Sequence, residues 1–396
     1  MKRILILTPW IPYPVTGADQ QDRFFGMLQM KNMGYDIRVI AKIHNFQNRD
    51  DVESAYAHEG IPLQLFPHPT SRMRLLMRNL PRMVLNPGLL DGATLEYLEP
   101  EYLAGVEKTI AEFQPDVIWI EYTTHWSILK RLKSFNIPII VKSSLNEPRN
   151  CIDENGGTLL SRLKSLPKYI GERTAAREAN LILGITPDEE MWYRSLGAQK
   201  TGVLPLRGLS RCFITRVHTE KPILDAVFLS SNYNMGHNRD ALQFLLTEII
   251  PAVRSAMPGT YRFHVTGRKF PKQLEKYLAE DVISVGFVPD IGEFLGTMDV
   301  ALSPWITGQG MQQKVFEPLC RSIPTMTTKT GGYPFMEDKE VLLCATPEDY
   351  VAGFHKFLSA EERNRISKAA YQKSESLFSE QALKNIMQDA INRVVV

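Results

Sequence analysis

The residues best suited to chemistry lie together in the segment SPWITGQGMQQKVFE, residues 303–317. An apolar run ends at Ser303, a glycine-containing loop follows, and a helical pattern starts near Gly310. The first amides of a helix have no partner within it and bind anions, and Gly308 and Gly310 allow a phosphate to approach the backbone closely. Lys314 lies one turn into the helix, where its charge would neutralise a diphosphate. We therefore expect a phosphate-binding site at this helix start.

Glu317 follows Lys314 by three residues and shares its helix face. A carboxylate in this position can accept hydrogen bonds from two ribose hydroxyls, as an acidic residue does in dinucleotide sites. A structural interpretation is also open, in which Lys314 and Glu317 form a surface ion pair that stabilises the helix by about 0.3 kcal/mol.

The elements that must position this segment follow an alternating pattern. Short apolar runs, expected to be strands buried on both faces, are separated by amphipathic helical stretches, which is the signature of parallel sheets covered by helices. The strands expected in the first half are Arg3–Thr8, Asp36–Lys42, Leu63–Phe66, Val117–Glu121, Pro138–Lys142, Leu181–Gly184 and Gly202–Leu204.

The alternation restarts after an irregular stretch. The strands expected in the second half are Ala226–Ser230, Arg262–Thr266, Val282–Val285, Val300–Ser303, Pro324–Thr327 and Val341–Cys344. We therefore predict an N-terminal Rossmann-like domain at 1–207, a linker at 208–224, a C-terminal Rossmann-like domain at 225–377, and a helix at 378–396 that packs back across the junction. Ligands of such domains bind beyond the carboxyl ends of the strands.

Composition bounds the function. The chain has 396 residues, a net charge of +2, and no long run of Lys and Arg, so no nucleic-acid partner is expected. Its four cysteines are widely spaced and signal neither a zinc site nor a disulfide framework. The basic, apolar N-terminus is too short for a signal sequence and fits a buried strand, and no apolar run reaches the roughly 20 residues of a membrane span. We expect a cytoplasmic protein.

The segment 303–317 and the Pro that follows resemble the signature of glycosyltransferase family 4, in the variant with Lys three residues before the helix Glu. Gly310, Lys314, Glu317 and Pro324 fit that pattern. Family members often carry a further Glu, which contacts the donor sugar, where this chain has Gln309. The resemblance extends over nearly the whole chain.

The resemblance implies the GT-B fold, in which two Rossmann-like, doubly wound domains face a central cleft. It also implies hexosyl transfer, with retention, from a UDP-, GDP- or other nucleoside-diphosphate sugar to a glycan, lipid-linked or small-molecule acceptor in glycan or glycoconjugate biosynthesis. No Asp-x-Asp follows an apolar strand, so we expect no metal ion or other cofactor, with helix dipoles and cations holding the leaving group.

The resemblance assigns roles in the N-terminal half. Gly17 falls at the turn that approaches the donor phosphates, although a simple turn glycine is the alternative. Arg23 either helps to bind phosphate or caps the surface. Glu121 occupies a strand end where the family often has a His that meets the donor sugar, and His125 follows four residues later; either side chain, like Gln309, is a candidate for a catalytic role.

A loop and three strand ends complete the expected site. Asn146 and Glu147 match a loop on the acceptor side, with an Asn-Pro turn as the structural alternative. The family's Gly-Arg after the first strand of the second half is missing here, which leaves the diphosphate to Lys314 and other groups. These are Arg268 as a helping cation and the backbone of Gly308, Gly310 and Met311 at the helix start. The resemblance implies that the backbone of Phe287 and Val288 contacts the nucleotide base.

Two stretches in the first half, 71–85 and 161–173, are basic and apolar, with Arg and Lys at regular intervals and Glu172 as their one acid. They fit either helices on an anionic membrane surface, which would make the protein membrane-associated on the cytoplasmic face, or solvated helix faces above a buried apolar stripe.

Two other functions also remain open, a GT-B-type sugar-nucleotide epimerase or hydrolase and a non-catalytic partner subunit. Gln309 counts against the epimerase, which needs a carboxylate pair near the sugar.

Overall fold

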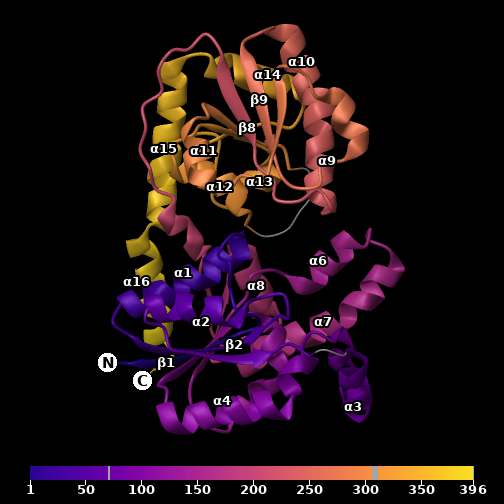
Figure 1. Ribbon diagram of the computed structural model, residues 1–396, viewed down its shortest axis with the longest axis vertical. Helices are drawn as coiled ribbons and strands as arrows, with labels where there is room; N and C mark the ends of the chain where they lie inside the picture. The colour runs from indigo at the N-terminus through magenta and orange to yellow at the C-terminus, as the bar shows by residue number, and fades with distance from the viewer. Residues whose placement is uncertain (70–71, 306–310, 396) are drawn as a thin grey trace. The chain divides into compact units, whose positions relative to one another are not determined.

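The computed structural model describes residues 1–69, 72–305 and 311–395. The chain forms two units (Figure 1), unit 1 from Met1–Gly208 together with Leu383–Val396, and unit 2 from Leu209–Ala382. The predicted fold class, two parallel α/β Rossmann-like domains, is confirmed. Each strand expected from the apolar runs is present, with its ends within two residues of the expected positions.

Unit 1 is built on a parallel sheet whose described strands follow the order β3-β2-β1-β4-β5-β6-β7. Successive side chains of β1 alternate between its faces. Ile4 and Ile6 join a core with α1, α2 and α16, whereas Leu5 and Leu7 join a core on the other face. The strands are β1 (Arg3–Thr8), β2 (Asp36–Ile43), β3 (Leu63–Pro67), β4 (Val117–Glu121), β5 (Ile139–Lys142), β6 (Leu181–Gly184) and β7 (Thr201–Val203).

Helices cover both faces of this sheet, as a parallel sheet requires. They are α1 (Ala18–Asn32), α2 (Arg49–His58), α3 (Arg72–Leu85), α4 (Pro100–Phe113), α5 (Leu129–Lys133), α6 (Glu147–Glu154), α7 (Leu159–Glu178) and α8 (Pro187–Ser195), with the short helices η1 (Pro87–Asp91), η2 (Leu95–Leu98) and η3 (Thr123–Ile128).

The C-terminal helix α16 (Glu380–Asn392) completes unit 1. Its apolar stripe, Leu383, Met387, Ala390 and Ile391, is buried in the same core as Ile4. Arg393 just beyond the helix donates to the Thr201 carbonyl oxygen of β7 at 2.9 Å. The last segment of the chain is therefore part of the first unit.

Unit 2 repeats the architecture with a parallel sheet whose described strands follow the order β10-β9-β8-β11-β12-β13. The strands are β8 (Leu224–Phe228), β9 (Tyr261–Thr266), β10 (Val282–Gly286), β11 (Val300–Ser303), β12 (Thr325–Thr327) and β13 (Leu342–Leu343). The helices are α9 (Gly236–Phe244), η5 (Leu245–Ile249), α10 (Ile250–Ala256), η6 (Lys272–Tyr277), α11 (Ile291–Gly296), α12 (Gln313–Cys320), α13 (Lys329–Gly332), α14 (Pro347–Phe357) and α15 (Ala360–Phe378).

The stretch expected to link the halves, 208–224, begins inside the short helix η4 (Arg207–Arg211) and then runs along unit 2. The backbone amide of His218 donates to the side chain of Asn364 at 2.8 Å, and the Asn364 amide returns a bond to the His218 carbonyl at 2.9 Å. This stretch is therefore packed against unit 2. Among the described helices, none combines the length and apolar character needed to cross a membrane.

Candidate functional site

The carboxyl ends of the unit 2 strands bring the expected donor-site segments to one edge of the sheet. Because the strands are parallel, Asn232 after β8, Arg268 after β9 and Trp305 after β11 lie at this edge. The loops after β8 and β9 are joined by the amide of Arg268, which donates to the Ser231 carbonyl oxygen at 3.0 Å. Unit 2 thus has its loops at the edge where such folds bind ligands.

Lys314, in the first turn of α12, lies in an aromatic and amide environment. Its ammonium nitrogen is 3.4 Å from the centroid of the Trp305 ring and donates to the side-chain oxygen of Asn238 at 2.6 Å. Asn238 is itself fixed, because its amide nitrogen donates to the Asn232 carbonyl oxygen at 2.7 Å. Loops from three elements therefore converge on this one cation.

The charge of Lys314 has no counter-charge in the described part of the chain. No described carboxylate forms an ion pair with it, and its partners are a neutral amide and a π face. Burial disfavours the ammonium and lowers the pKa of Lys314 to about 7. The neighbouring His237 also has its pKa lowered, to about 4, by burial and then by Lys314. An anion placed here would restore the charge of Lys314.

Glu317 lies one turn further along α12 and has its own partners. Its carboxylate accepts from Arg321 Nη2 at 3.2 Å and from the Gln313 amide at 3.4 Å. The side chain is buried, at 6% exposed. Lys314 and Glu317 do not pair with each other among the contacts of the described residues, so the surface ion-pair interpretation is wrong.

Arg268 and Phe287 form a second group at the same sheet edge. The guanidinium of Arg268 stacks over the Phe287 ring, 4.0 Å from its centroid. Phe287 is 51% exposed. Val288 next to it is half-buried. Gly267, just before Arg268, has φ +124° and lies against the Tyr233 ring, where a Cβ would be 2.8 Å from a ring carbon. An exposed aromatic ring backed by a cation suits a planar base.

Part of the expected site lies outside the described residues. Gly308, Gln309 and Gly310 are among the residues that the structure does not describe, so their predicted contacts with the donor stay predictions. Met311 is described; it is buried just before α12. Among the described residues, no three His, Cys, Asp or Glu side chains are arranged to hold a metal ion.

Sequence reasoning missed the two partners of Lys314. Asn238 lies in the first turn of α9, whose N-cap residue Met235 makes no side-chain cap, and it joins Asn232 to Lys314. The position of Trp305 in the sequence could have indicated its role. It is a large aromatic residue directly after a buried strand and before the glycine loop, and it is 1% exposed.

In unit 1, Gly17 precedes α1 at the carboxyl end of β1, with an extended backbone (φ −101°). Gly17 thus lies in the turn before α1, but its backbone angles do not require glycine, and its contact with the donor phosphates stays a prediction. Arg23 is fully buried, and it donates to the Thr8 hydroxyl at 2.7 Å and to Asp19 at 2.6 Å. The interpretation of Arg23 as a surface cap is therefore wrong, because this side chain fastens α1 to the end of β1.

Glu121 ends β4 and is 1% exposed. Both of its oxygens accept from Arg207, at 2.8 and 2.9 Å, and one also accepts from the Trp119 indole at 2.9 Å. The carboxylate therefore has a structural role in the described conformation. A direct catalytic role for Glu121 stays a prediction that these contacts do not favour.

His125 lies in η3 and is fully buried. Its Nε2 shares a 2.9 Å hydrogen bond with the Tyr102 hydroxyl, and its ring stacks on Tyr97 with centroids 4.0 Å apart. Burial, with a smaller contribution from Lys42, lowers the pKa of His125 to about 3. The ring is therefore neutral at physiological pH. Glu121 and His125 have separate partners and do not form a pair.

A compensated charge network lies behind Glu121. Arg207 bridges Glu121 and Asp22, and Lys142 donates to Asp22 at 2.7 Å. Burial alone would raise the pKa of Asp22, but Arg207 and then Lys142 hold it well below its usual range. Gly26 on α1 leaves room for this network, since a Cβ there would be 2.3 Å from the Arg207 guanidinium.

The expected acceptor loop is tied down by its own chain. The Asn146 side chain caps α6 by accepting from the Arg149 amide at 3.1 Å. Glu147 pairs with Lys168 of α7 at 3.1 Å, and Lys168 also pairs with Asp91 at 3.1 Å. Asn146 therefore has the structural role of a helix cap, and its contact with an acceptor stays a prediction.

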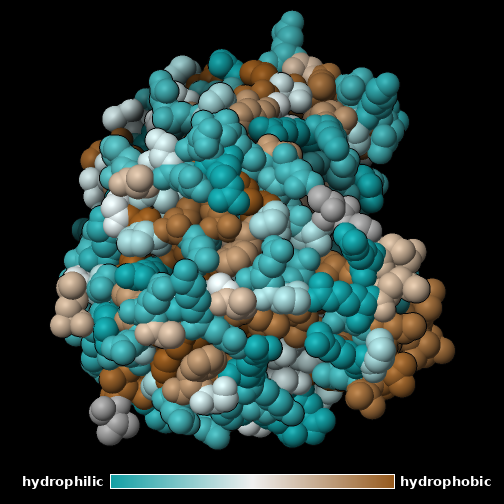
Figure 2. Space-filling model, turned by 60° about the horizontal axis from the view of Figure 1, so that its bottom comes forward, coloured by the Kyte–Doolittle hydropathy of each residue, from teal (hydrophilic) through white to brown (hydrophobic). Residues whose placement is uncertain are grey.

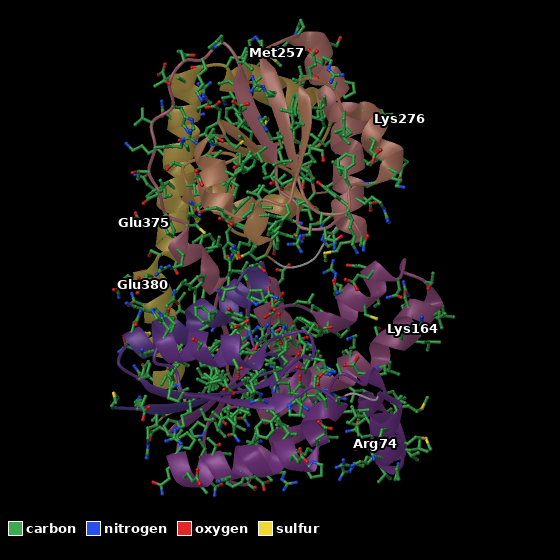
Figure 3. The ribbon with its side chains drawn as sticks, viewed as in Figure 1. Arg74, Lys164, Met257, Lys276, Glu375 and Glu380 are labelled. Atoms are coloured by element: carbon green, nitrogen blue, oxygen red, sulfur yellow. The ribbon has the colours of Figure 1, made fainter. Side chains whose placement is uncertain are left out.

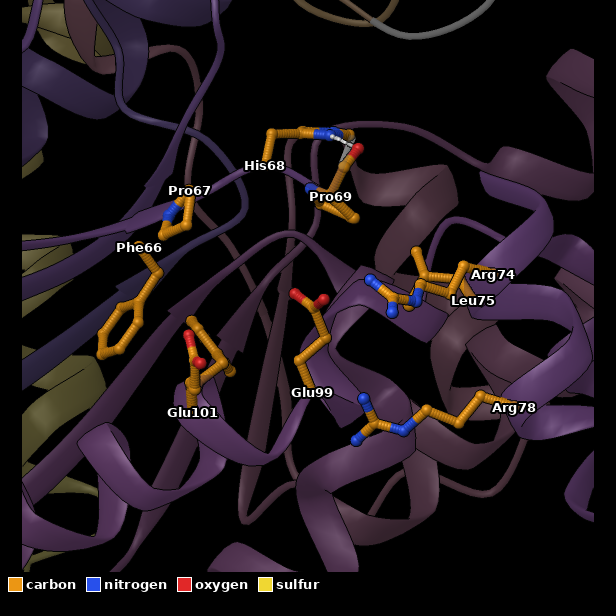
Figure 4. A pocket seen from close by; sticks show the side chains of 10 residues that line it. Phe66, Pro67, His68, Pro69, Arg74, Leu75, Arg78, Glu99 and Glu101 are labelled. Carbon is orange, nitrogen blue, oxygen red and sulfur yellow. Dashed lines mark hydrogen bonds between the residues drawn. The ribbon is translucent and has the colours of Figure 1, made fainter. Parts of the chain in front are cut away.

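A cavity of about 220 Å³ lies in unit 1 between the end of β3 and α3. Arg74 and Arg78 of α3 extend toward Glu99 on its wall (Figure 4), and Glu99 is paired with Lys42 at 2.6 Å. Both signs of charge line this cavity, and none of the residues expected to bind the donor does.

Two family descriptions match the chain. "Glycosyl transferase 4-like domain" matches residues 27–207, and "Glycosyl transferases group 1" matches residues 225–360. Among curated protein sequences, none matches significantly.

Solved structures share the fold. Alr3699/HepE of Anabaena, in complex with UDP and glucose, aligns with a TM-score of 0.66 and 14% identity over 99% of this chain and 100% of that chain. Sucrose-phosphate synthase of Thermosynechococcus elongatus aligns with a TM-score of 0.68 and 12% identity over 99% of each chain. A mutant TarM of S. aureus, in complex with fondaparinux, α-GlcNAc-glycerol and UDP, aligns with a TM-score of 0.65 and 11% identity over 99% of this chain and 100% of that chain.

The buried network predicts a large stability loss for Arg207→Met. Removing this guanidinium leaves the Glu121 and Asp22 carboxylates without a main partner in the core, which costs about 3–5 kcal/mol of unfolding free energy. Urea unfolding followed by circular dichroism measures the loss. The control is Arg49→Met, which removes an exposed 3.0 Å pair with Glu53 and should cost below about 1 kcal/mol. Equal losses in the two variants would contradict the structural role of the network.

Proposed function

We infer that this chain transfers a hexosyl group from a nucleoside-diphosphate sugar to an acceptor hydroxyl. The matches of its two halves to a glycosyl transferase 4-like domain and to glycosyl transferases group 1 support this inference. The observation that carries the donor site is the half-buried ammonium of Lys314, which has a π face and a neutral amide around it but no described counter-charge. A diphosphate supplies the missing charge. UDP is the first donor nucleotide to test, because Alr3699/HepE and TarM were crystallised with it.

The proposed reaction breaks the bond between the anomeric carbon and the diphosphate oxygen. Negative charge then grows on the leaving diphosphate, where Lys314, the amides at the start of α12 and Arg268 would stabilise it. In this proposal the protein's cations and helix dipole neutralise the leaving group, so no metal ion is required. Because Lys314 is held by Asn238 and Trp305 before any ligand arrives, little reorganisation is needed during the reaction.

We propose retention of the anomeric configuration, with the leaving diphosphate oxygen accepting the proton of the acceptor hydroxyl. The new bond forms between that hydroxyl oxygen and the anomeric carbon. The burial of Glu121 and His125, the two described candidates for a protein base, supports this route. Unit 1 would bind the acceptor, as the resemblance implies.

Glu317 would hold the donor ribose by accepting hydrogen bonds from its two hydroxyls. Arg321 and Gln313 support this role, since they fix the carboxylate in a low-exposure site on the face of α12 that carries Lys314 one turn earlier. The four cysteines are free thiols, which supports the proposal that this reaction belongs to glycan or glycoconjugate synthesis in the reducing cytoplasm.

The ribose assignment predicts weaker nucleotide binding by Glu317→Gln. Losing a charged hydrogen-bond partner costs roughly 1.5–3 kcal/mol, or roughly tenfold to a hundredfold in Kd for UDP. Isothermal titration calorimetry measures this change, and Glu348→Gln, an exposed residue in the first turn of α14, is the control. If Glu317→Gln binds UDP as tightly as the control does, the ribose assignment is wrong.

The charge assignment predicts slower chemistry in Lys314→Met. Release of UDP from a UDP-hexose should fall by roughly a hundredfold, the usual effect of removing one group that stabilises developing charge. Coupled detection of UDP, with and without an added acceptor sugar, measures the rate, and Lys276→Met on the surface of unit 2 is the control.

The same assay decides between the functions. Unchanged release in Lys314→Met would overturn the diphosphate site. Absence of turnover by the wild-type protein with every donor tested would favour the non-catalytic partner, and a product of inverted configuration would exclude retention.

A further inference from the structure

Two helices of unit 1 have their polar and apolar faces reversed. In the first half of α7, Ser161 and Ser165 are buried, whereas four leucines are between 52% and 76% exposed, namely Leu159, Leu160, Leu163 and Leu166. The second half of the same helix is ordinary, with Ala175 and Ala176 fully buried in the core. The reversal is therefore a local feature of residues 159–166.

α3 repeats the reversal. Its Asn79 is buried, at 2% exposed, whereas Met73, Met77, Leu80 and Val84 are all exposed. Each polar side chain that faces inward is satisfied locally. Asn79 donates to the Leu75 carbonyl at 2.9 Å, and Ser161 and Ser165 donate to carbonyls one turn earlier, each at 2.7 Å. On α3, Met83 also faces inward and is buried in the core. The buried Asn79, Ser161 and Ser165 need no partner from another element, and most of the other apolar side chains of the two segments point outward.

The two helices belong to one surface. The short helix η1 packs against both α3 and α7, and Lys168 of α7 pairs with Asp91 at its end. Figure 2 shows brown apolar side chains gathered along the right-hand margin of the lower part of the molecule, and Figure 3 labels Arg74 and Lys164 on this side of unit 1. We call this surface, formed by Met73–Leu85 and Leu159–Leu166, the reversed face.

The reversed face is positively charged, and this charge favours an anionic partner. The exposed cations Arg74, Arg78 and Arg82 of α3 and Arg162 and Lys164 of α7 alternate with the apolar side chains, and neither segment contains Asp or Glu. Glu99 and Glu101 line the cavity beside α3 together with Arg74 and Arg78, and Glu99 is also paired with Lys42. The reversed face therefore carries net positive charge.

We propose that the reversed face binds the surface of an anionic lipid bilayer, with the leucine and methionine side chains in the interface and the Arg and Lys side chains on the headgroups. Protein interfaces are enriched in Tyr, Trp, Phe, Met and Arg and poor in Lys, and leucine is under-represented among their hot spots. The apolar part of the reversed face is instead mostly exposed leucine, and neither segment contains an aromatic residue. This inference goes beyond the proposed transfer reaction and does not depend on it.

Vesicle flotation of the full chain tests the proposal. The protein should float with vesicles of phosphatidylcholine and phosphatidylglycerol and stay unbound with phosphatidylcholine alone. Leu160→Ser/Leu163→Ser and Arg162→Gln/Lys164→Gln should each reduce binding to anionic vesicles by roughly tenfold or more, since the first removes an apolar and the second a charged contribution.

Two matched controls accompany these variants. Met191→Ser/Val217→Ser removes side chains that are 60% and 82% exposed elsewhere, and Lys276→Gln/Lys373→Gln removes exposed charges of unit 2; both should float like the wild-type protein. UDP titration of every variant should be unchanged, which separates this test from that of the donor site.

Three outcomes would overturn the proposal. They are no flotation with anionic vesicles, equal flotation with neutral ones, and an equal loss in the controls. A dimer in light scattering that the Leu160→Ser/Leu163→Ser variant dissociates would assign the reversed face to a second copy of the chain.

Discussion

A buried charge must be compensated within the fold or by a ligand, and this constraint separates the two halves of the molecule by role. In unit 1, Asp22 and Glu121 lie against Arg207 and Lys142, and every one of these charges has an opposite charge within 3.0 Å. In unit 2, Lys314 is held by Asn238 and Trp305, neither of which is charged. A compensated cluster holds a sheet and helix together, whereas an uncompensated cation in a fixed site is poised for an anion. We therefore propose that the donor diphosphate binds at Lys314 and that Glu121 belongs to the framework.

The fold was readable from the sequence because parallel strands are buried on both faces. The run VIWIE of β4 is wholly buried, and such runs at regular intervals leave few alternatives to two Rossmann-like domains. The presence of α12 was readable for a similar reason, since a strand, a glycine loop and a helix are local features of the sequence, although the helix begins at Gln313 rather than near Gly310.

What the sequence could not show is the set of long-range partners. Arg207 lies 86 residues from Glu121, and Asn238 lies 76 residues from Lys314, so neither pairing leaves a local pattern. Glu121 ends β4 and His125 follows in η3, but the partners that fix both side chains are distant in the sequence.

The reversed face and the donor site are separate features. In each of them, side chains of the described structure lie in an environment that does not match their polarity or charge. In α3 and α7 the groups are apolar side chains directed to solvent above buried Ser and Asn. In α12 the group is a cation with neutral neighbours. A protein with both features would bind a nucleotide sugar through unit 2 and an anionic membrane through unit 1. This combination suits an acceptor that is itself lipid-linked, one of the acceptor classes that the sequence resemblance implies.

The titration of Lys314 tests the central claim most directly. Nuclear magnetic resonance of the protein carrying ¹³C at the lysine side chains resolves this group, with Lys314→Arg identifying its signal. The account predicts a pKa of about 7 in the free protein, because burial disfavours the ammonium. Saturation with UDP should raise this pKa toward the ordinary lysine value of about 10.4, because the diphosphate favours the charged form. An ordinary pKa in the free protein, or a pKa that UDP leaves unchanged, would contradict the assignment of Lys314 to the diphosphate.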